Sequence, residues 1–313
     1  AKTGYYKIKK ILRGQNWDKK MVSPLTAVGV NANEGDYIIA VNGKSTAKMK
    51  NLYQALVNTV GKQVRLTLNS APSPKGTREV VVVPLENEIP LYYYNWVQKN
   101  IETVNKATKG KVGYIHIPDM GLAGLSDFIK LYYPQLRKKA LIIDVRFNGG
   151  GFVSQLIVER LRREVVFIEI SRYAVPRLNT EGMLDGPKVC IIDEFAGSDG
   201  DIFPYRFKKY GLGKVIGKRT WGGAVGIRRP LPLLDGGQLF KPEFALYDPE
   251  GKKYVIEGYG VDPDIFVDND PAKEFAGIDE QLDKAIETIL EELKTKEKHI
   301  PPPPPEPDKQ VKH

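Results

Sequence analysis

The sequence has few of the residues that most often carry redox or metal chemistry. Its 313 residues include one cysteine, Cys190, and three histidines, His116, His299 and His313. One cysteine cannot form a disulfide within the chain, and its position in an apolar run predicts a small buried side chain rather than a catalytic thiol. No apolar run reaches the roughly 18 residues of a membrane-spanning helix, so we expect no membrane partner. The chain begins at Ala1 without an initiator methionine, and we expect it to derive from a longer protein.

Acidic residues are scarce in the first part of the chain. The net charge is +9, and residues 1–85 hold 14 Lys and Arg against 4 Asp and Glu, so the basic excess lies entirely there. The sequence shows no zinc-ligand spacing, RNA-binding aromatic motif or basic helix, so a solvated basic face is favoured over a nucleic-acid site. Apolar residues make up 42% of the chain and charged residues 27%. That composition is typical of a globular protein, and the length suits about two domains.

The first 85 residues have the pattern of a small β-rich domain. Tyr37–Val41 is a compact apolar run that ends at Asn42-Gly43, a dipeptide typical of hairpin turns. Apolar residues recur at helical spacing from Met49 to Val60, which predicts a helix. Further strands are predicted at Tyr6–Leu12, Val64–Leu68 and Val80–Val83.

Beyond residue 85 the pattern changes to alternating strands and helices. Residues 86–110 predict a connecting helix, and residues 111–296 predict a layered α/β domain that ends with an amphipathic helix over Gly277–Lys294. One strand of this domain is expected at 164–170. Residues 297–313 are rich in proline and have little to bury, which predicts an extended or disordered tail.

A serine stands among glycines and aspartates just after the apolar run Val189–Ile192. A helical pattern follows Ser198, with Pro204 expected near its first turn. A sharp strand-to-helix turn with small neighbours is the arrangement that exposes a nucleophilic hydroxyl. The alternative is that Ser198 or Asp199 caps the helix, because both residue types are favoured at that position. The local pattern leaves both interpretations open.

Two further segments offer groups for a reaction. Asn148–Gly151 lies between a predicted strand and a predicted helix, where backbone amides and the helix dipole favour an anion. Its spacing matches no nucleotide-binding motif, so an oxyanion site and a plain tight turn are the two interpretations. Glu257 ends a short predicted strand, and its carboxylate gains a role only if a histidine needs to be oriented.

Taken together, four segments resemble one family. They are "NGGG", "DEFAGSDGDIFPYRFKKYGLGKVIGKRTWGGAVGI", "IEGYGVDPDI" and "GIDEQLDKAIE". The sequence is similar to the tricorn-type serine proteases, relatives of the C-terminal processing peptidases, from about Tyr5 to Leu293. The stretch "SPLTAVGVNANEGDYIIAVNGKS" resembles the PDZ domains of bacterial and archaeal proteases. The resemblance implies a crotonase-like layered α/β core over residues 111–296, preceded by a PDZ domain at 1–85 that we expect to be truncated at its start.

The same resemblance implies roles for individual residues. Ser198 matches the nucleophile, and the amide of Asp199, with that of Gly150 or Gly151, matches the oxyanion hole. Glu257 matches the acidic residue that supports the catalytic histidine. No metal and no organic cofactor is implied.

Substrates, partners and location are also implied only by the family. Peptides or unfolded chains are the expected substrates, and Glu169 and Asp185 are candidates for an acidic pocket that selects the substrate side chain. A homo-oligomer in the cytoplasm is expected, with no nucleic acid as partner. A catalytically silent PDZ-containing module that binds peptides is the alternative function.

The base that activates Ser198 is not evident in the chain. C-terminal processing peptidases use a lysine, but Gly223 stands at the matching position, so the resemblance requires a histidine. His116 lies on a predicted strand, where a structural role is favoured, and the other two histidines lie in the tail. Because only tail histidines follow Ser198, the residue order of an α/β-hydrolase is excluded. In the tricorn family the catalytic histidine precedes the PDZ domain, so we expect a segment before Ala1 to supply it.

Overall fold

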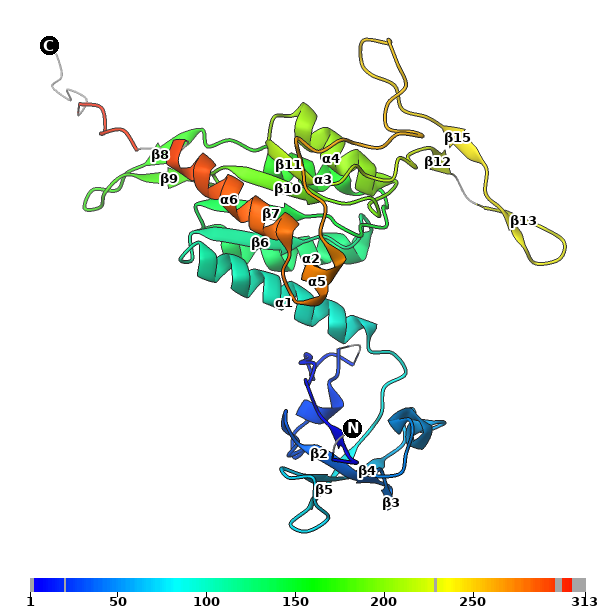
Figure 1. The fold of residues 1–313 in the computed structure, drawn as a ribbon. Coiled ribbons are helices and arrows are strands. Elements are labelled where there is room, and N and C mark those ends of the chain that lie inside the picture. The colour runs from blue at the N-terminus through cyan, green and yellow to red at the C-terminus, as the bar shows by residue number, and fades with distance from the viewer. Residues whose placement is uncertain (1–2, 20, 228–229, 296–299, 306–313) are drawn as a thin grey trace, which may run out of the picture. The chain divides into compact units, whose positions relative to one another are not determined.

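A computed structural model describes residues 3–19, 21–227, 230–295 and 300–305 of the chain (Figure 1). The chain divides into two compact units, Ala1–Lys99 and Asn100–His313. Within the described ranges, every helix is too short or too polar to cross a bilayer.

The first unit is built around a five-stranded antiparallel sheet. The strand order is β1-β2-β4-β5, with β3 paired to β2. The predicted hairpin turn lies between β2 and β3, where Asn42 and Gly43 have φ angles of 47° and 76°. Two successive positive φ angles match the twist of the flanking strands. The strands are β1 (Tyr6–Lys7), β2 (Tyr37–Val41), β3 (Lys44–Ser45), β4 (Val64–Asn69) and β5 (Arg78–Val82).

The helix predicted from Met49 to Val60 is wrong in extent and type. The structure has a short 3-10 helix, η2 (Leu52–Leu56), and a second one, η1 (Pro24–Thr26). The Asn51 side chain accepts the Tyr53 amide at 2.9 Å and starts η2. Asn58, at a φ of 58°, prevents the helix from continuing to Val60. Leu52 and Leu56 are partly buried, whereas Tyr53 and Val60 are exposed, so the apolar spacing does not mark several turns of α-helix.

The second unit contains a parallel sheet with the order β16-β11-β10-β7-β6. Every residue of the three strands β6, β7 and β10 is buried, as expected where helices cover both faces of a parallel sheet. The strands are β6 (Val112–His116), β7 (Ala140–Asp144), β10 (Lys188–Ile192), β11 (Gly213–Gly217) and β16 (Ile265–Phe266).

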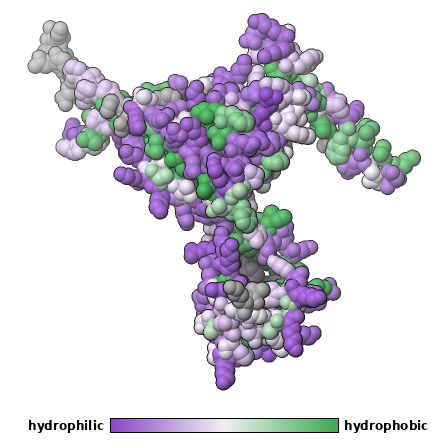
Figure 2. All heavy atoms as spheres, in the orientation of Figure 1, coloured by the Kyte–Doolittle hydropathy of each residue, from purple (hydrophilic) through white to green (hydrophobic). Residues whose placement is uncertain are grey.

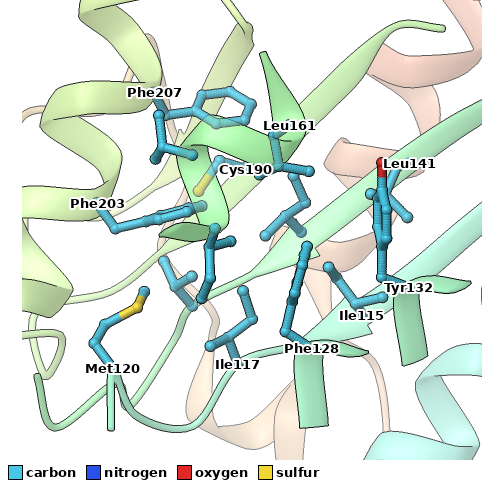
Figure 3. Close-up of a cluster of buried hydrophobic side chains, with 14 of the residues drawn as sticks. Ile115, Ile117, Met120, Phe128, Tyr132, Leu141, Leu161, Cys190, Phe203 and Phe207 are labelled. Carbon is cyan, nitrogen blue, oxygen red and sulfur yellow. The ribbon is translucent and has the colours of Figure 1, made fainter. Parts of the chain in front are cut away.

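Helices form a layer on each face of this sheet. Helix α6 lies across β7, β10 and β11 on one face, while α2, α3 and α4 share the other face (Figure 1). Figure 3 shows the second layer, where Phe128, Phe203 and Phe207 pack on Cys190 and neighbouring strand residues. Cys190 is fully buried. The helices are α1 (Ile89–Ala107), α2 (Leu122–Tyr132), η3 (Tyr133–Gln135), α3 (Ser154–Leu161), α4 (Asp199–Lys209), α5 (Pro271–Phe275) and α6 (Glu280–Thr295).

The layered α/β core and the small β-rich domain before it confirm the predicted fold class, but one predicted strand is misplaced. Residues 164–170 contribute β8 (Phe167–Glu169), which pairs only with β9 (Arg177–Asn179) in an exposed hairpin. An apolar run by itself does not distinguish a strand buried in a sheet from one in a projecting hairpin. Two more two-stranded segments project from the core: β12 (Gly226–Ile227) with β15 (Pro242–Phe244), and β13 (Leu231–Pro232) with β14 (Gln238–Leu239).

The projecting segment around β13 and β14 exposes apolar side chains, seen as green spheres in Figure 2. They include Leu233, Leu234 and Phe240. Of the predicted tail, residues 300–305 are exposed and without regular structure, and the remainder, with His299 and His313, lies outside the described residues.

Candidate active site

Ser198 occupies a strained turn between strand β10 and helix α4. Strand β10 ends at Ile192 and α4 begins at Asp199, directly after the serine. Ser198 has φ 57° and ψ −122°, a region that non-glycine residues rarely adopt. Its side chain makes no capping hydrogen bond, and its Oγ has no hydrogen-bond partner among the residues that the structure describes. Ser198 therefore does not act as a helix cap. Helix α4 starts earlier than predicted, which places Pro204 beyond the first turn.

The glycines beside Ser198 permit close contact with two other loops. A Cβ atom on Gly197 would lie 2.7 Å from the Trp221 ring, and one on Gly200 would lie 2.7 Å from the Asn148 carbonyl oxygen. Real Cβ contacts are essentially never this short. The small residues around Ser198 are thus required by packing on both sides of the turn.

Asp199 attaches the start of α4 to the start of α3. Its buried carboxylate accepts hydrogen bonds from the Ser154 amide, at 2.9 Å, and from the Ser154 hydroxyl. Arg206 in turn donates to the Ser154 hydroxyl at 2.8 Å. The Asp199 backbone amide itself has no acceptor among the described residues.

The glycine loop 148–151 lies against the Ser198 turn. A Cβ atom on Gly150 would be 2.6 Å from the Ser198 Cβ and 3.1 Å from the Asp199 nitrogen. The Asn148 side chain donates to the Ile117 carbonyl at 2.8 Å, and its Oδ1 accepts the Gly150 amide at 2.9 Å. The Gly151 amide has no acceptor within the described part of the chain. Two unpaired amides, of Gly151 and Asp199, therefore lie on the two loops that meet at Ser198.

Sequence reasoning missed Asp201, which connects α4 to the loop after Trp221. Its fully buried carboxylate accepts the Gly222 and Gly223 amides at 2.8 and 3.2 Å. Burial raises the pKa of Asp201, and hydrogen bonds from Thr220 and from these amides oppose that shift. In the sequence, the place of Asp201 three residues after Ser198 was the feature that could have indicated its closeness to the site.

Glu257 is joined to the same loop. Its Oε2 accepts the amides of Ala224 and Val225, both at 2.7 Å. It does not end a strand as predicted, because the Glu257 amide donates to the Val255 carbonyl in a γ-turn centred on Ile256 at φ 72°. A positive φ is strained for a β-branched residue, so the local conformation that presents Glu257 is held by its surroundings.

His116 is buried and contacts the backbone, as expected of a histidine with a structural role. It is 2% exposed, and its Nε2 lies 2.9 Å from the Arg146 carbonyl oxygen. Burial lowers the pKa of His116, although the nearby Asp144 carboxylate opposes that shift. These contacts place it inside the sheet rather than at Ser198.

The structure does not bring Glu169 or Asp185 to Ser198. Glu169 lies on the exposed β8–β9 hairpin, where Arg177 donates to it at 2.8 Å. Asp185 precedes β10 and lines a cavity of about 370 Å³ with Arg162 and Tyr210. Ser198 follows the carboxyl end of β10, so the length of that strand separates it from Asp185.

The chain matches two known protein-family models. The family described as Peptidase family S41 matches residues 111–267, and the Tricorn protease PDZ domain matches residues 1–87. The chain belongs to peptidase family S41, in its tricorn type. It carries a PDZ domain followed by the S41 core, as its resemblance to the family implied.

Similar proteins include much longer tricorn proteases. The Tricorn protease of Thermoplasma volcanium is 39% identical over 95% of this chain, and the Tricorn protease homolog of Saccharolobus solfataricus is 42% identical over 92%. A crystal structure of the tricorn protease superposes with a TM-score of 0.83 over 93% of this chain, at 38% identity. The S41 chain described here spans 29%, 26% and 28% of these proteins, respectively.

Proposed function

We propose that this chain supplies the nucleophile, the oxyanion-binding amides and the acidic support of a serine peptidase. The observation that carries the proposal is Ser198 itself. It is strained at φ 57°, its side chain makes no capping hydrogen bond, and it lies beside two amides that have no acceptor among the described residues. In the reaction, Ser198 Oγ attacks the peptide carbonyl carbon while a base takes its proton. The peptide C–N bond then breaks, and the protonated amine leaves before water releases the acyl group from the serine.

The amides of Asp199 and Gly151 are the proposed oxyanion donors. Gly151 is preferred to Gly150 because the Gly150 amide donates to Asn148. Each such donor stabilises the transition state by about 3 kcal/mol when it is aimed at the developing charge. The mechanism uses no metal or organic cofactor.

The proposed base is a histidine from outside these 313 residues, oriented by Glu257. His116 is buried inside the sheet, and the amides of Ala224 and Val225 engage only Oε2 of Glu257. Oε1 of Glu257 has no partner among the described residues and is available to an imidazole or to a group that holds one. A carboxylate in this position fixes the imidazole tautomer and stabilises its charged form.

Peptides or unfolded chains are the proposed substrates. Within the first unit, a cavity of about 900 Å³ is lined by apolar side chains and by Tyr6, Tyr53 and Tyr92, which suits an extended peptide. A homo-oligomer in the cytoplasm, without nucleic-acid or membrane partners, is proposed on the family relationship alone. A catalytically silent peptide-binding module has less support, because such a module has no need of a strained serine beside unpaired amides.

A fluorophosphonate probe tests the assignment. In the protein as encoded in full, the probe should label Ser198 and the Ser198→Ala variant should not be labelled. The 313-residue chain by itself should label slowly and hydrolyse fluorogenic peptides little, because an unactivated hydroxyl is a weak nucleophile. No labelling of the full protein would favour the binding module. Robust hydrolysis by the 313-residue chain, abolished by His116→Ala, would contradict both the external base and the structural role of His116.

A further inference from the structure

Asp193 lies where the loop that carries Ser198 meets the glycine loop. It follows strand β10 and is 3% exposed. Its Oδ1 accepts the amides of Phe195 and Ala196 at 3.2 and 3.0 Å. Both of its oxygens also accept the amide of Phe147, each at 3.0 Å. One carboxylate thus binds the serine loop at two amides and the glycine loop at a third.

A second contact joins the same two loops at the surface. The rings of Phe147 and Phe195 stack with centroids 5.4 Å apart and planes 13° from parallel. They are 56% and 62% exposed, respectively, so their contact with each other gains little from burial. Phe147 has a φ of 59°, a conformation that is strained for a bulky residue. The hydrogen bond to Asp193 and the stacked ring hold it in that conformation.

We propose that Asp193 is a positioning residue that fixes the oxyanion loop, Phe147–Gly151, against the Ser198 turn. The Phe147–Phe195 stack joins the same two segments, and Asp193 and this stack together are called the clamp. The proposal rests on the proposed function, because it concerns the separation between Ser198 Oγ and the Gly151 amide. Asp193 touches neither substrate nor reacting atoms. It acts through the backbone of both loops.

The negative charge on Asp193 lowers the stability of the fold, although it strengthens the hydrogen bonds from the three amides of the clamp. Burial raises the pKa of Asp193 to about 6, and the neighbouring Asp144 carboxylate on β7 adds to the shift. The amides of Phe147, Phe195 and Ala196 favour the charged form and lower the pKa, but do not cancel the effect of burial. At neutral pH the fold therefore holds an ionised group that it would bind better as the neutral acid.

This imbalance gives the free energy of unfolding a defined pH dependence. An unfolded aspartate releases its proton near pH 4, whereas folded Asp193 keeps it up to about pH 6. Between these values the folded state binds more protons, so the contribution of Asp193 to stability falls as pH rises from about 4 to 6. An asparagine at this position removes the titration and its cost.

The decisive variant is Asp193→Asn in the protein as encoded in full, assayed at pH 8. Asparagine keeps one acceptor oxygen for the three amides, but it sets an N–H donor against the Phe147 amide where the second oxygen lay. We expect kcat to fall by roughly ten- to a hundredfold, the loss that follows misplacement of a catalytic group, with KM within about twofold. The inhibition constant of a peptide boronic acid, whose tetrahedral adduct occupies the oxyanion hole, should rise by a similar factor. The free energy of unfolding at pH 8 should not decrease.

Phe147→Ala and Asp248→Asn complete the experiment. Phe147→Ala removes the stack but keeps the amide hydrogen bond, so a smaller rise in the boronic acid inhibition constant is expected. Asp248 is a buried aspartate that accepts the Lys252 amide at 2.7 Å within its own loop, and Asp248→Asn should leave kcat unchanged.

The outcomes separate the clamp from the proposed function. Unchanged kcat and boronic acid affinity in Asp193→Asn would overturn the clamp, as would a lower kcat that merely follows loss of folded protein. If Asp193→Asn does not fold, unchanged boronic acid affinity in Phe147→Ala overturns it instead. Normal turnover in Ser198→Ala would show that the proposed function is wrong. If Ser198→Ala is inactive but Asp193→Asn is fully active, the clamp is wrong and the proposed function stands.

Discussion

At the scale of single residues, three buried aspartates explain why acidic side chains surround the proposed nucleophile. Each accepts backbone amides from a different segment, and none hydrogen-bonds to Ser198 Oγ. The three are Asp193, bonded to Phe147, Asp199, bonded to Ser154, and Asp201, bonded to Gly222 and Gly223. These bonds connect the glycine loop, the start of α3 and the loop after Trp221 to one turn. Ser198 is half-buried among these acids, whose carboxylates are occupied by amides of other residues.

Ser198→Ala should abolish turnover and leave the fold intact. Alanine fits the same turn with the same backbone strain, since the conformation is set by glycines and strands rather than by the hydroxyl. Hydrolysis of a fluorogenic peptide and the thermal unfolding midpoint measure the two effects. Ser126→Ala, at an exposed position on α2, is the control and should behave as wild type. Near-normal turnover by Ser198→Ala would reject the assignment of the nucleophile.

Adjacent glycines give a matched pair of variants in the oxyanion loop. Gly150→Ala places a Cβ 2.6 Å from the Ser198 Cβ at a φ of 82°, so turnover should fall at least a hundredfold. The backbone strain alone should cost about 1–2 kcal/mol of unfolding free energy. A Cβ on Gly149 meets no atom within 4 Å, and Gly149→Ala should keep most of the activity. Equal losses in both variants would mean that the loop tolerates no side chain at all.

At the scale of elements, a buried ion-pair network joins strand β7 to helix α6. Arg146 follows β7 and donates to Asp144 at 2.7 Å and to Asp279 at 2.9 Å. Tyr114 donates to the same Asp144 at 2.8 Å. The carboxylates raise the pKa of Arg146, so it stays charged although it is 3% exposed. The network fixes the segment that leads from β7 into the oxyanion loop.

Asp279→Ala should lower the free energy of unfolding by about 3 kcal/mol, because it leaves the buried Arg146 with one of its two carboxylates. Urea denaturation at pH 7 measures the change. Glu287→Ala, on the exposed side of α6, should change it by less than about 0.5 kcal/mol. A loss in Asp279→Ala no larger than in Glu287→Ala would show that the network adds nothing to stability.

At the scale of the whole molecule, charge is divided between the two units. The positive excess lies in the first 85 residues, which supply most of the lining of the apolar cavity of the first unit. A basic PDZ unit can attract the carboxylate at the end of a peptide, and exposed charges act over about 8–10 Å at physiological salt.

If this attraction guides substrates, kcat/KM for peptides with a free C-terminus should fall as ionic strength rises, with little change in kcat. Amidated peptides of the same sequence are the control and should show a weaker dependence. A series of assays between low and physiological salt measures both. Identical salt dependence for free and amidated peptides would show that the basic residues form a solvated face and do not attract the peptide carboxylate.

The sequence by itself determined the fold class, and its resemblance to the tricorn-type proteases indicated the PDZ domain and Ser198 as the candidate nucleophile. These conclusions depend on local information: apolar runs, the Asn42-Gly43 turn, and motifs close together in the chain. Periodicity also determined helices α1 and α6, since each is long and amphipathic.

Only the tertiary structure decided which groups meet. Asp193 binds Phe147 and Asp201 binds Gly222, partners that lie far away in the chain, so no local pattern predicts these contacts. The choice of Gly151 over Gly150 depends on one hydrogen bond from Gly150 to Asn148, which no pattern of residues encodes. The misplaced strand at 164–170 has the same origin, since burial of an apolar run is decided by what packs on it.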